Sequence, residues 1–326
     1  MKQGIKFVSI TAKNNEEFGY KLGKALKNEI QDRLKKNKAF YIKKTFNGKD
    51  FSKLIEKSKK FLPATKKYFP HLLIEAEAMA KGAEVPFEEL FVLMCDEEIL
   101  DFKVYPTNPL HCTSVAIRTK DKRILISHNE DWFPEYRKNG LALVNGKIGK
   151  NKFIGLGYIG QLAGTSCGFN SSGIAHTDNS LVFKRVSKEV PRSFHLRALL
   201  DVKSPNEARK ILNTSGSIVS STMIISSNHD IMNIEELWTK DILQKAKDWF
   251  IHTNHPLDKK NQNKENTIKE SVVRYNKAKE ILENAKELNI ETLKKITTDH
   301  PSEICSHIKK KNPSGYTVTV ASVIMN

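Results

Sequence analysis

The chain has 326 residues, of which 39% are hydrophobic and 8% aromatic, and these values exclude an intrinsically disordered protein. No apolar run approaches the roughly 20 residues needed to cross a bilayer. The formal net charge is +17, and residues 1–60 carry 17 Lys and Arg against 6 Asp and Glu. A lysine-rich, solvated helix face accounts for this charge, although a basic face also fits nucleic acid or an anionic membrane surface.

The start of the chain has no long apolar segment and no small-residue cleavage site. We therefore expect no signal peptide, no membrane association and a cytoplasmic location.

Apolar residues at helical spacing predict helices over 14–37, 50–82 and 86–102. Two prolines and an asparagine within 106–109 then end the helical pattern.

From Cys112 onward the chain alternates short strand-like runs with polar turns. The runs 113–118 and 123–128 predict a hairpin. Further strands are predicted at 140–144, 152–158, 164–175, 220–226 and 316–325, and further helices at 191–200, 204–213 and 268–287. Residues 258–267 are predicted to form a solvated loop. The order of helices, strands, helices and a last strand indicates an α+β fold.

The four cysteines, Cys95, Cys112, Cys167 and Cys305, contain no CxxC pair. This spacing argues against a disulfide framework and against a zinc ribbon. We expect Cys167 to face the core.

Two other patterns were weighed as binding sites. The glycines at 155, 157 and 160 fit GxGxxG but open no helix, so we expect a packing point and no dinucleotide site. His176, His252 and His255 match no standard metal spacing, and we expect them to be hydrogen-bonded core or pocket wall. The sequence therefore predicts neither a cofactor nor a metal.

Cys112 is the strongest candidate for chemistry. It follows an irregular segment and opens a strand whose hairpin partner leads to Asp131. A thiol at a strand start with a carboxylate nearby is a sensible arrangement for a nucleophile. A buried structural cysteine is the alternative that these residues alone leave open.

The segment His111-Cys112-Thr113-Ser114, followed by Asn129-Glu130-Asp131-Trp132, resembles the isopenicillin N acyltransferase (peptidase C45) branch of the N-terminal-nucleophile hydrolases. Four further stretches resemble that family and its choloylglycine hydrolase relatives in the same order: 168–179, 252–256, 271–275, and 304–307 with 319–325.

The resemblance implies a four-layer αββα sandwich formed by 112–326. It also implies that the helical segment 1–111 is a pro-segment that stays associated after the chain cuts itself between His111 and Cys112.

The same resemblance implies the site and its chemistry. Cys112 is the nucleophile, and its own α-amine, once released, is the base. Asp131 holds that amine, Asn254 and Asn179 donate to the oxyanion, and Arg274 orients Asp131. The acyl group of a small linear amide, or of an acyl donor such as acyl-CoA, passes to Cys112 as a thioester and then to water or an amine.

Two positions depart from the family pattern. His111 stands where the family often has glycine, which puts the self-cleavage in doubt. His128 stands where the bile-salt branch has arginine, which counts against bile salts.

Two rival readings remain at this point. One is a papain-like thiol hydrolase that uses Cys112 with a distant histidine. The other is a basic protein that binds nucleic acid or a membrane surface and has an inactive catalytic site.

Overall fold

A computed structural model describes residues 4–45, 51–99, 111–181, 189–214, 220–226, 231–236, 241–262, 269–307 and 317–326. Among these residues, no helix is both long and apolar enough to cross a membrane.

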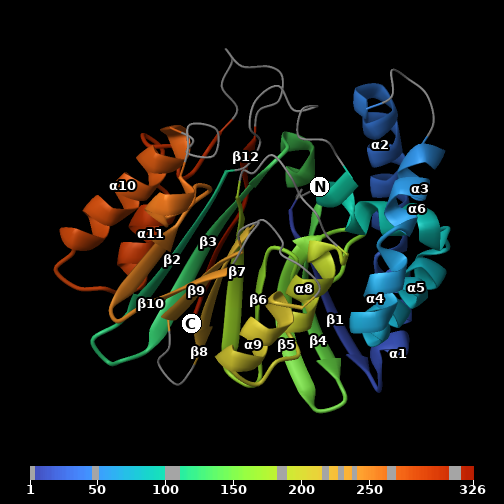
Figure 1. The fold of residues 1–326 in the computed structure, drawn as a ribbon, viewed down its shortest axis with the longest axis horizontal. Helices are drawn as coiled ribbons and strands as arrows, with labels where there is room; N and C mark the ends of the chain where they lie inside the picture. The colour runs from blue at the N-terminus through green and yellow to red at the C-terminus, as the bar shows by residue number, and fades with distance from the viewer. Residues whose placement is uncertain are drawn as a thin grey trace.

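Two β-sheets form the centre of the fold (Figure 1). The large sheet has the strand order β1-β4-β5-β6-β7-β8-β9-β10, and the small sheet has the order β11-β2-β3-β12. The strands of the large sheet are β1 (Lys6–Ala12), β4 (Leu141–Ile148), β5 (Asn151–Tyr158), β6 (Cys167–Asn170), β7 (Ile174–Ser180), β8 (Ser220–Ser226), β9 (Ile231–Glu236) and β10 (Asp241–Ala246). Those of the small sheet are β11 (Trp249–His252), β2 (His111–Arg118), β3 (Ile124–Trp132) and β12 (Val318–Met325).

Alternate residues of each strand pack into different layers, as the two-residue period of a strand requires. Ala116 and Ile126 of the small sheet meet Leu156 and Ala175 of the large sheet in one apolar cluster between the sheets. The outer face of the small sheet packs on α10 (Lys269–Glu283) and α11 (Ile290–Thr297). The outer face of the large sheet packs on α8 (Arg192–Leu199) and α9 (Pro205–Leu212). Figure 1 shows α10 and α11 beside the small sheet and α8 and α9 over the strands of the large sheet. The predicted αββα sandwich is confirmed.

Seven helices precede the small sheet within the described part of the chain. They are α1 (Asn15–Ala25), α2 (Lys27–Thr45), α3 (Ser52–Lys59), α4 (Leu62–Tyr68), α5 (Pro70–Ala83), α6 (Phe87–Met94) and α7 (Asp96–Ile99). The prediction of one continuous helix over 50–82 is wrong, because three helices, α3, α4 and α5, span this stretch. Prolines at the starts of α4 and α5 divide it, because proline is favoured in the first turn of a helix and disfavoured in its interior.

The N-terminal segment is not purely helical, which corrects the sequence analysis. β1 lies at the edge of the large sheet and pairs in parallel with β4. Only some of its inward-facing residues are buried, as expected for an edge strand. The strand is short and has few buried apolar residues, so its two-residue hydrophobic period is too weak to predict a strand. The first 99 residues therefore contribute a strand as well as helices to the sandwich.

Close contacts fasten these helices to the rest of the fold. α1 and α5 pack so tightly that a Cβ on Gly19 would lie 2.0 Å from the carbonyl oxygen of Glu75. The carboxylate of Glu75 is fully buried and receives both Nε and Nη2 of Arg197 on α8 at 2.9 Å each. A buried bidentate pair of this kind costs much when one partner is lost, so it fixes α5 against α8.

Several strands and one helix were not predicted, and one predicted strand has the wrong bounds. β9, β10, β11 and α11 were not predicted, and the single strand predicted over 164–175 is a turn followed by the β6–β7 hairpin. Gly173 in that hairpin has φ of +76°, a conformation that glycine adopts without the penalty of a Cβ. The η3 turn (Lys259–Asn261) lies within the predicted loop.

Candidate active site

The site lies at the start of β2, where the hairpin with β3 brings distant residues together. His111 pairs with Asp131, and Cys112 pairs with Glu130. Residues directly opposite in an antiparallel pair share a face, so Cys112 and Glu130 share the face between the two sheets. The predicted return of the chain to Asp131 beside the start of β2 is confirmed.

The thiol of Cys112 is buried, with the residue 6% exposed. Its Sγ donates to Oε1 of Glu130 at 3.8 Å. Burial raises the pKa of the Cys112 thiol well above its ordinary value, and the negative charges of Glu130 and Asp131 raise it further. Because the thiolate is the reactive form of a cysteine, a reactive Cys112 would need a base to take its proton.

Glu130 is a site residue that the sequence analysis did not single out. It accepts from Tyr158 Oη at 2.5 Å, and Nε2 of His128 lies 3.0 Å from its second oxygen. Burial acts to raise the pKa of Glu130, but hydrogen bonds from His128 and Tyr158 outweigh it and hold the pKa below its ordinary value. An ionised carboxylate therefore lies beside the thiol. The two-residue spacing of Glu130 and His128 along β3 was the available signal.

Cys112, His128 and Glu130 are also a possible set of metal ligands, because one donor atom of each lies within 4.8 Å of the others. In this structure the donor atoms are engaged with one another.

Asn254 and Arg274 hold the backbone of Cys112. The backbone N–H of Cys112 donates to Oδ1 of Asn254 at 2.7 Å, and Nη2 of Arg274 donates to the same oxygen at 2.8 Å. Nη1 of Arg274 donates to the Cys112 carbonyl at 2.5 Å. Because two donors face Oδ1, the orientation of the Asn254 amide is defined by its surroundings. Its Nδ2 donates to the Ser180 carbonyl at 3.0 Å.

Asn179 reaches the same site from β7 of the large sheet. Its Oδ1 accepts from the hydroxyl of Ser114 at 2.6 Å. Its Nδ2 is buried and has no hydrogen-bond partner among the residues that the structure describes. A buried donor without a partner costs roughly 1–3 kcal/mol, and such groups often serve a function. Asn179 thus brings a hydrogen-bond donor without a partner in the described structure to the strand that carries Cys112.

Asp131 lies on the opposite face of β3 from Glu130 and is fully buried. Neither of its carboxylate oxygens has a well-formed hydrogen bond within the described residues. Burial raises the pKa of Asp131 well above its ordinary value, by more than the nearby Arg274 guanidinium and the Thr319 side chain lower it. The buried surroundings of Asp131 therefore disfavour its ionised form.

The histidines weighed in the sequence analysis are hydrogen-bonded core. Nε2 of His176 contacts the Gly164 carbonyl at 2.9 Å, and burial lowers the pKa of His176 to about 4. Nε2 of His252 lies 2.9 Å from Oε1 of Glu235. His255 contacts the Ser271 hydroxyl at 2.8 Å.

The remaining patterns also have structural explanations. Cys167 belongs to the cluster between the sheets, as predicted. Of the GxGxxG glycines, Gly155 lies in β5 so close to a neighbouring loop that a Cβ would be 2.8 Å from the nitrogen of Gly164. This pattern is a packing point, as predicted.

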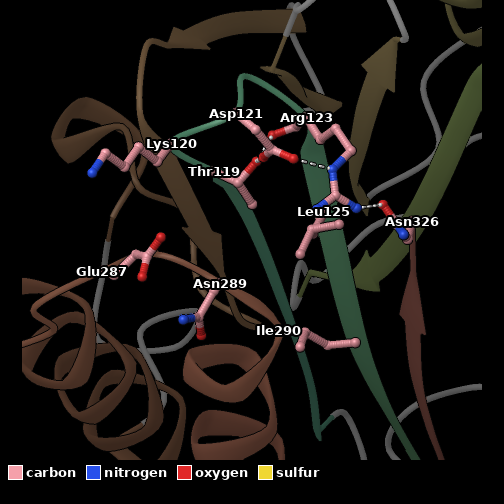
Figure 2. A pocket seen from close by; sticks show the side chains of 9 residues that line it. All are labelled: Thr119, Lys120, Asp121, Arg123, Leu125, Glu287, Asn289, Ile290 and Asn326. Atoms are coloured by element: carbon pink, nitrogen blue, oxygen red, sulfur yellow. Dashed lines mark hydrogen bonds and ion pairs between the residues drawn. The ribbon is translucent and has the colours of Figure 1, made fainter.

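A pocket of about 450 Å³ lies elsewhere, at the far end of the β2–β3 hairpin (Figure 2). Its lining includes the hairpin turn, with Asp121 and Arg123, and the start of α11 near Ile290. At about 3.3 Å per residue, Cys112 is some 20 Å away along β2. This pocket is not part of the constellation around the thiol.

The sequence matches a family described as acyl-coenzyme A:6-aminopenicillanic acid acyl-transferase over residues 117–326. The matched range begins after Cys112 and contains the other four predicted catalytic residues, Asp131, Asn179, Asn254 and Arg274. A curated relative, the beta-alanyl-dopamine/carcinine hydrolase of Drosophila melanogaster, is 30% identical over 170 residues. That match covers 48% of this chain and 44% of the relative, so it spans less than half of that protein's length.

Solved structures with a similar fold include the N-acylethanolamine-hydrolyzing acid amidase ortholog of Caenorhabditis elegans, with 15% identity and a TM-score of 0.49 over 66% of this chain and 92% of that one. A variant of the conjugated bile acid hydrolase of Clostridium perfringens has 14% identity and a TM-score of 0.46 over 66% and 86%. The match to the family covers well over half of the sequence. The chain belongs to the acyl-coenzyme A:6-aminopenicillanic acid acyl-transferase family.

Proposed function

We propose that this protein is a self-processing cysteine N-terminal-nucleophile enzyme that hydrolyses or transfers the acyl group of a small linear amide. The observation that carries the proposal is the environment of the Cys112 nitrogen. It donates to Asn254, whose oxygen also accepts from Arg274. The amino terminus that a cut after His111 would create is therefore already held in place.

The first reaction is the self-cleavage. Before the cut, the Cys112 nitrogen is an amide and cannot act as a base. The proton of the thiol passes to Glu130, to which Sγ already donates. Sγ then attacks the carbonyl carbon of His111, the C–N bond to Cys112 breaks, and the leaving nitrogen takes the proton from Glu130 to become an amine. Water hydrolyses the resulting thioester and releases His111 as a carboxylate.

The second reaction is turnover of substrate. The free α-amine has a pKa near 7.7–8.0 in model peptides, so a large fraction is neutral at cellular pH and can take the thiol proton. Asn254 accepts a hydrogen bond from this amine. Asn179 donates Nδ2 to the oxyanion of the tetrahedral intermediate. Sγ attacks the acyl carbon, and the C–N bond breaks as the leaving amine takes the proton that the α-amine holds. The acyl group, now a thioester on Cys112, then passes to water or to an acceptor amine.

Amides of β-alanine are the first substrates that we propose. The curated relative is named for the hydrolysis of β-alanyl-dopamine and carcinine. The name of the family adds acyl-coenzyme A as a candidate acyl donor and an amine as a candidate acceptor.

The segment before the cut is proposed to remain bound as a separate chain. Its helices share one apolar cluster with β4 and β5, and β1 stays in the ladder with β4. The buried pair between Glu75 and Arg197 adds a polar link. Separation would expose this cluster and leave a buried charge unpaired, so association after cleavage is favoured.

The experiment is intact-mass analysis of the purified protein, combined with an assay of amine release from β-alanyl-dopamine. The parent is expected as two chains that divide between His111 and Cys112. Cys112→Ala is expected as one uncut, inactive chain. Cys95 is also buried and lies between α6 and α7. Cys95→Ala is therefore the matched control and should be cut and active. An uncut parent with full activity, or an active Cys112→Ala protein, would refute the proposal.

A further inference from the structure

A second group of reactive side chains lies on the outer side of the small sheet, in the loop that follows α11. It consists of His300, Cys305 and His307. Their donor atoms lie within 4.8 Å of one another. The spacing of the three residues along the chain matches no standard zinc motif, so the sequence alone gave no reason to select them.

The distances within this group match those around a metal ion. Nε2 of His307 lies 3.6 Å from Sγ of Cys305 and 3.1 Å from Nδ1 of His300. Tetrahedral zinc, with bonds of about 2.0–2.1 Å to nitrogen and about 2.3 Å to sulfur, places two nitrogens about 3.3 Å apart and nitrogen and sulfur about 3.6 Å apart. Two of the three donor-atom distances therefore already match such a tetrahedron, and the third is below 4.8 Å. Nδ1 of His300 also lies 3.3 Å from the Cys305 carbonyl oxygen, a contact that the metal would replace.

Buried groups hold the loop that carries these donors. Asn129 of β3 is fully buried and donates Nδ2 to the carbonyls of Thr297 and Ile304 at 2.9 and 2.8 Å. Ser306 is joined to Thr319 of β12 by two hydrogen bonds of 2.8 and 3.0 Å. Supporting contacts of this kind keep metal ligands in position.

We propose that His300, Cys305 and His307 bind Zn²⁺, with one thiolate and two neutral imidazoles as ligands and a fourth position open to water. This mixed nitrogen and sulfur set is typical of zinc, and hard cations such as Mg²⁺ and Ca²⁺ prefer oxygen ligands. On binding, the Cys305 thiol loses its proton to solvent as the Zn–S bond forms. Both histidines are exposed, so an ion reaches them from solvent.

The site adjoins the catalytic residues but does not depend on the proposed reaction. Thr319, which contacts Ser306, pairs with Asp131 across the β3–β12 ladder. Because none of the three ligands is Cys112, metal binding can be tested on an uncut and inactive chain.

The test uses the full-length Cys112→Ala protein, because this substitution removes the thiol of the other possible ligand set, Cys112, His128 and Glu130. Equilibrium dialysis against Zn²⁺ with metal analysis is expected to give one ion per chain. Co²⁺ in place of Zn²⁺ should give the charge-transfer absorption of a thiolate ligand. Adding Cys305→Ser should abolish this absorption and weaken zinc binding at least tenfold.

Substitutions at exposed histidines test the site without disturbing the packed core. His307→Gln and His300→Asn should each weaken zinc binding at least tenfold, whereas His71→Gln, at an exposed histidine on α5, should leave it unchanged. Added His128→Ala should also leave it unchanged. Zinc binding that survives Cys305→Ser or His307→Gln, or is lost with His128→Ala, would overturn the proposal. So would a cobalt complex without thiolate absorption.

Discussion

Replacement of Asn179 by alanine separates the two asparagines of the site. In the ground state, the amide of Asn179 makes one hydrogen bond, which its oxygen accepts from Ser114. Its Nδ2 has no partner in the described structure. The loss of one hydrogen bond of this kind costs about 1 kcal/mol of folding free energy. Removal of a single oxyanion donor typically lowers kcat by about 10²–10³, or about 2.7–4 kcal/mol in the barrier.

The expected result is therefore a protein that folds nearly as well as the parent but turns over 10²–10³-fold more slowly. KM should change little, because the donor acts on charge that develops only in the transition state. The assay measures the release of amine from β-alanyl-dopamine per cleaved chain, with the cleaved fraction determined by intact mass. Counting cleaved chains is necessary because self-cleavage also passes through an oxyanion.

Ser114→Ala is the control, because it breaks the same hydrogen bond and leaves the Asn179 amide in place. It also removes the contact of Ser114 with Nδ1 of His128 at 2.9 Å, so its effect is an upper limit for the loss of the Ser114–Asn179 bond. Its kcat should fall by less than about tenfold, a limit set by the roughly 1 kcal/mol worth of one positioning hydrogen bond. An Asn179→Ala protein that is cleaved, folded and within threefold of the parent in kcat would refute the role of Asn179. Equal losses in the two variants would reduce that role to positioning alone.

Three further predictions concern cleavage, packing and pH. Glu130→Gln removes the carboxylate that accepts the Sγ hydrogen bond and should slow self-cleavage by about 10²–10⁴, followed as loss of the uncut chain by mass; an unchanged rate would exclude Glu130 as the base. Gly19→Ala places a Cβ 2.0 Å from the Glu75 carbonyl and should cost about 1–3 kcal/mol in denaturant unfolding, whereas Gly4→Ala, with nothing within 4 Å of its Cβ, should be neutral. The pKa of His176 is lowered to about 4 in the folded chain, against about 6.5 in the unfolded chain. Below about pH 6.5 the unfolded chain therefore binds more protons than the folded chain does. The free energy of unfolding is thus expected to fall by up to roughly 3 kcal/mol as the pH falls from about 6.5 toward 4. His176→Gln should flatten this part of the curve of stability against pH, and an unflattened curve would contradict the assignment.

The parts of the fold that local patterns specify could be predicted from the sequence. The hairpin that returns to Asp131 follows from two short runs of β-forming residues and a polar turn. The start of α9 follows from its cap, where the Ser204 hydroxyl accepts from the Glu207 backbone N–H. Both features depend on residues close together in the chain.

The parts that depend on contacts between distant segments could not be predicted in this way. β1 is a strand because β4 lies beside it, and no local pattern announces a partner more than 130 residues later in the chain. The role of Glu130 beside the thiol could not be predicted from the motif that contains it, because only the fold places Tyr158 against its carboxylate. The free amide nitrogen of Asn179 likewise depends on what the neighbouring strands leave open.

The uncut site contains one group that the proposed cleavage would satisfy. Asp131 is buried without a well-formed hydrogen bond in the described structure, and burial raises its pKa by more than Arg274 and Thr319 lower it. Cleavage would convert the neighbouring Cys112 nitrogen from a neutral amide into an amine that can carry positive charge. A cation next to a buried carboxylate favours the ionised form of that carboxylate and lowers its pKa. The free energy that burial of the Asp131 carboxylate costs before the cut would then be offset by its attraction to the new ammonium group after the cut. The same residue would thereby favour the processed state and hold the new amino terminus beside the thiol.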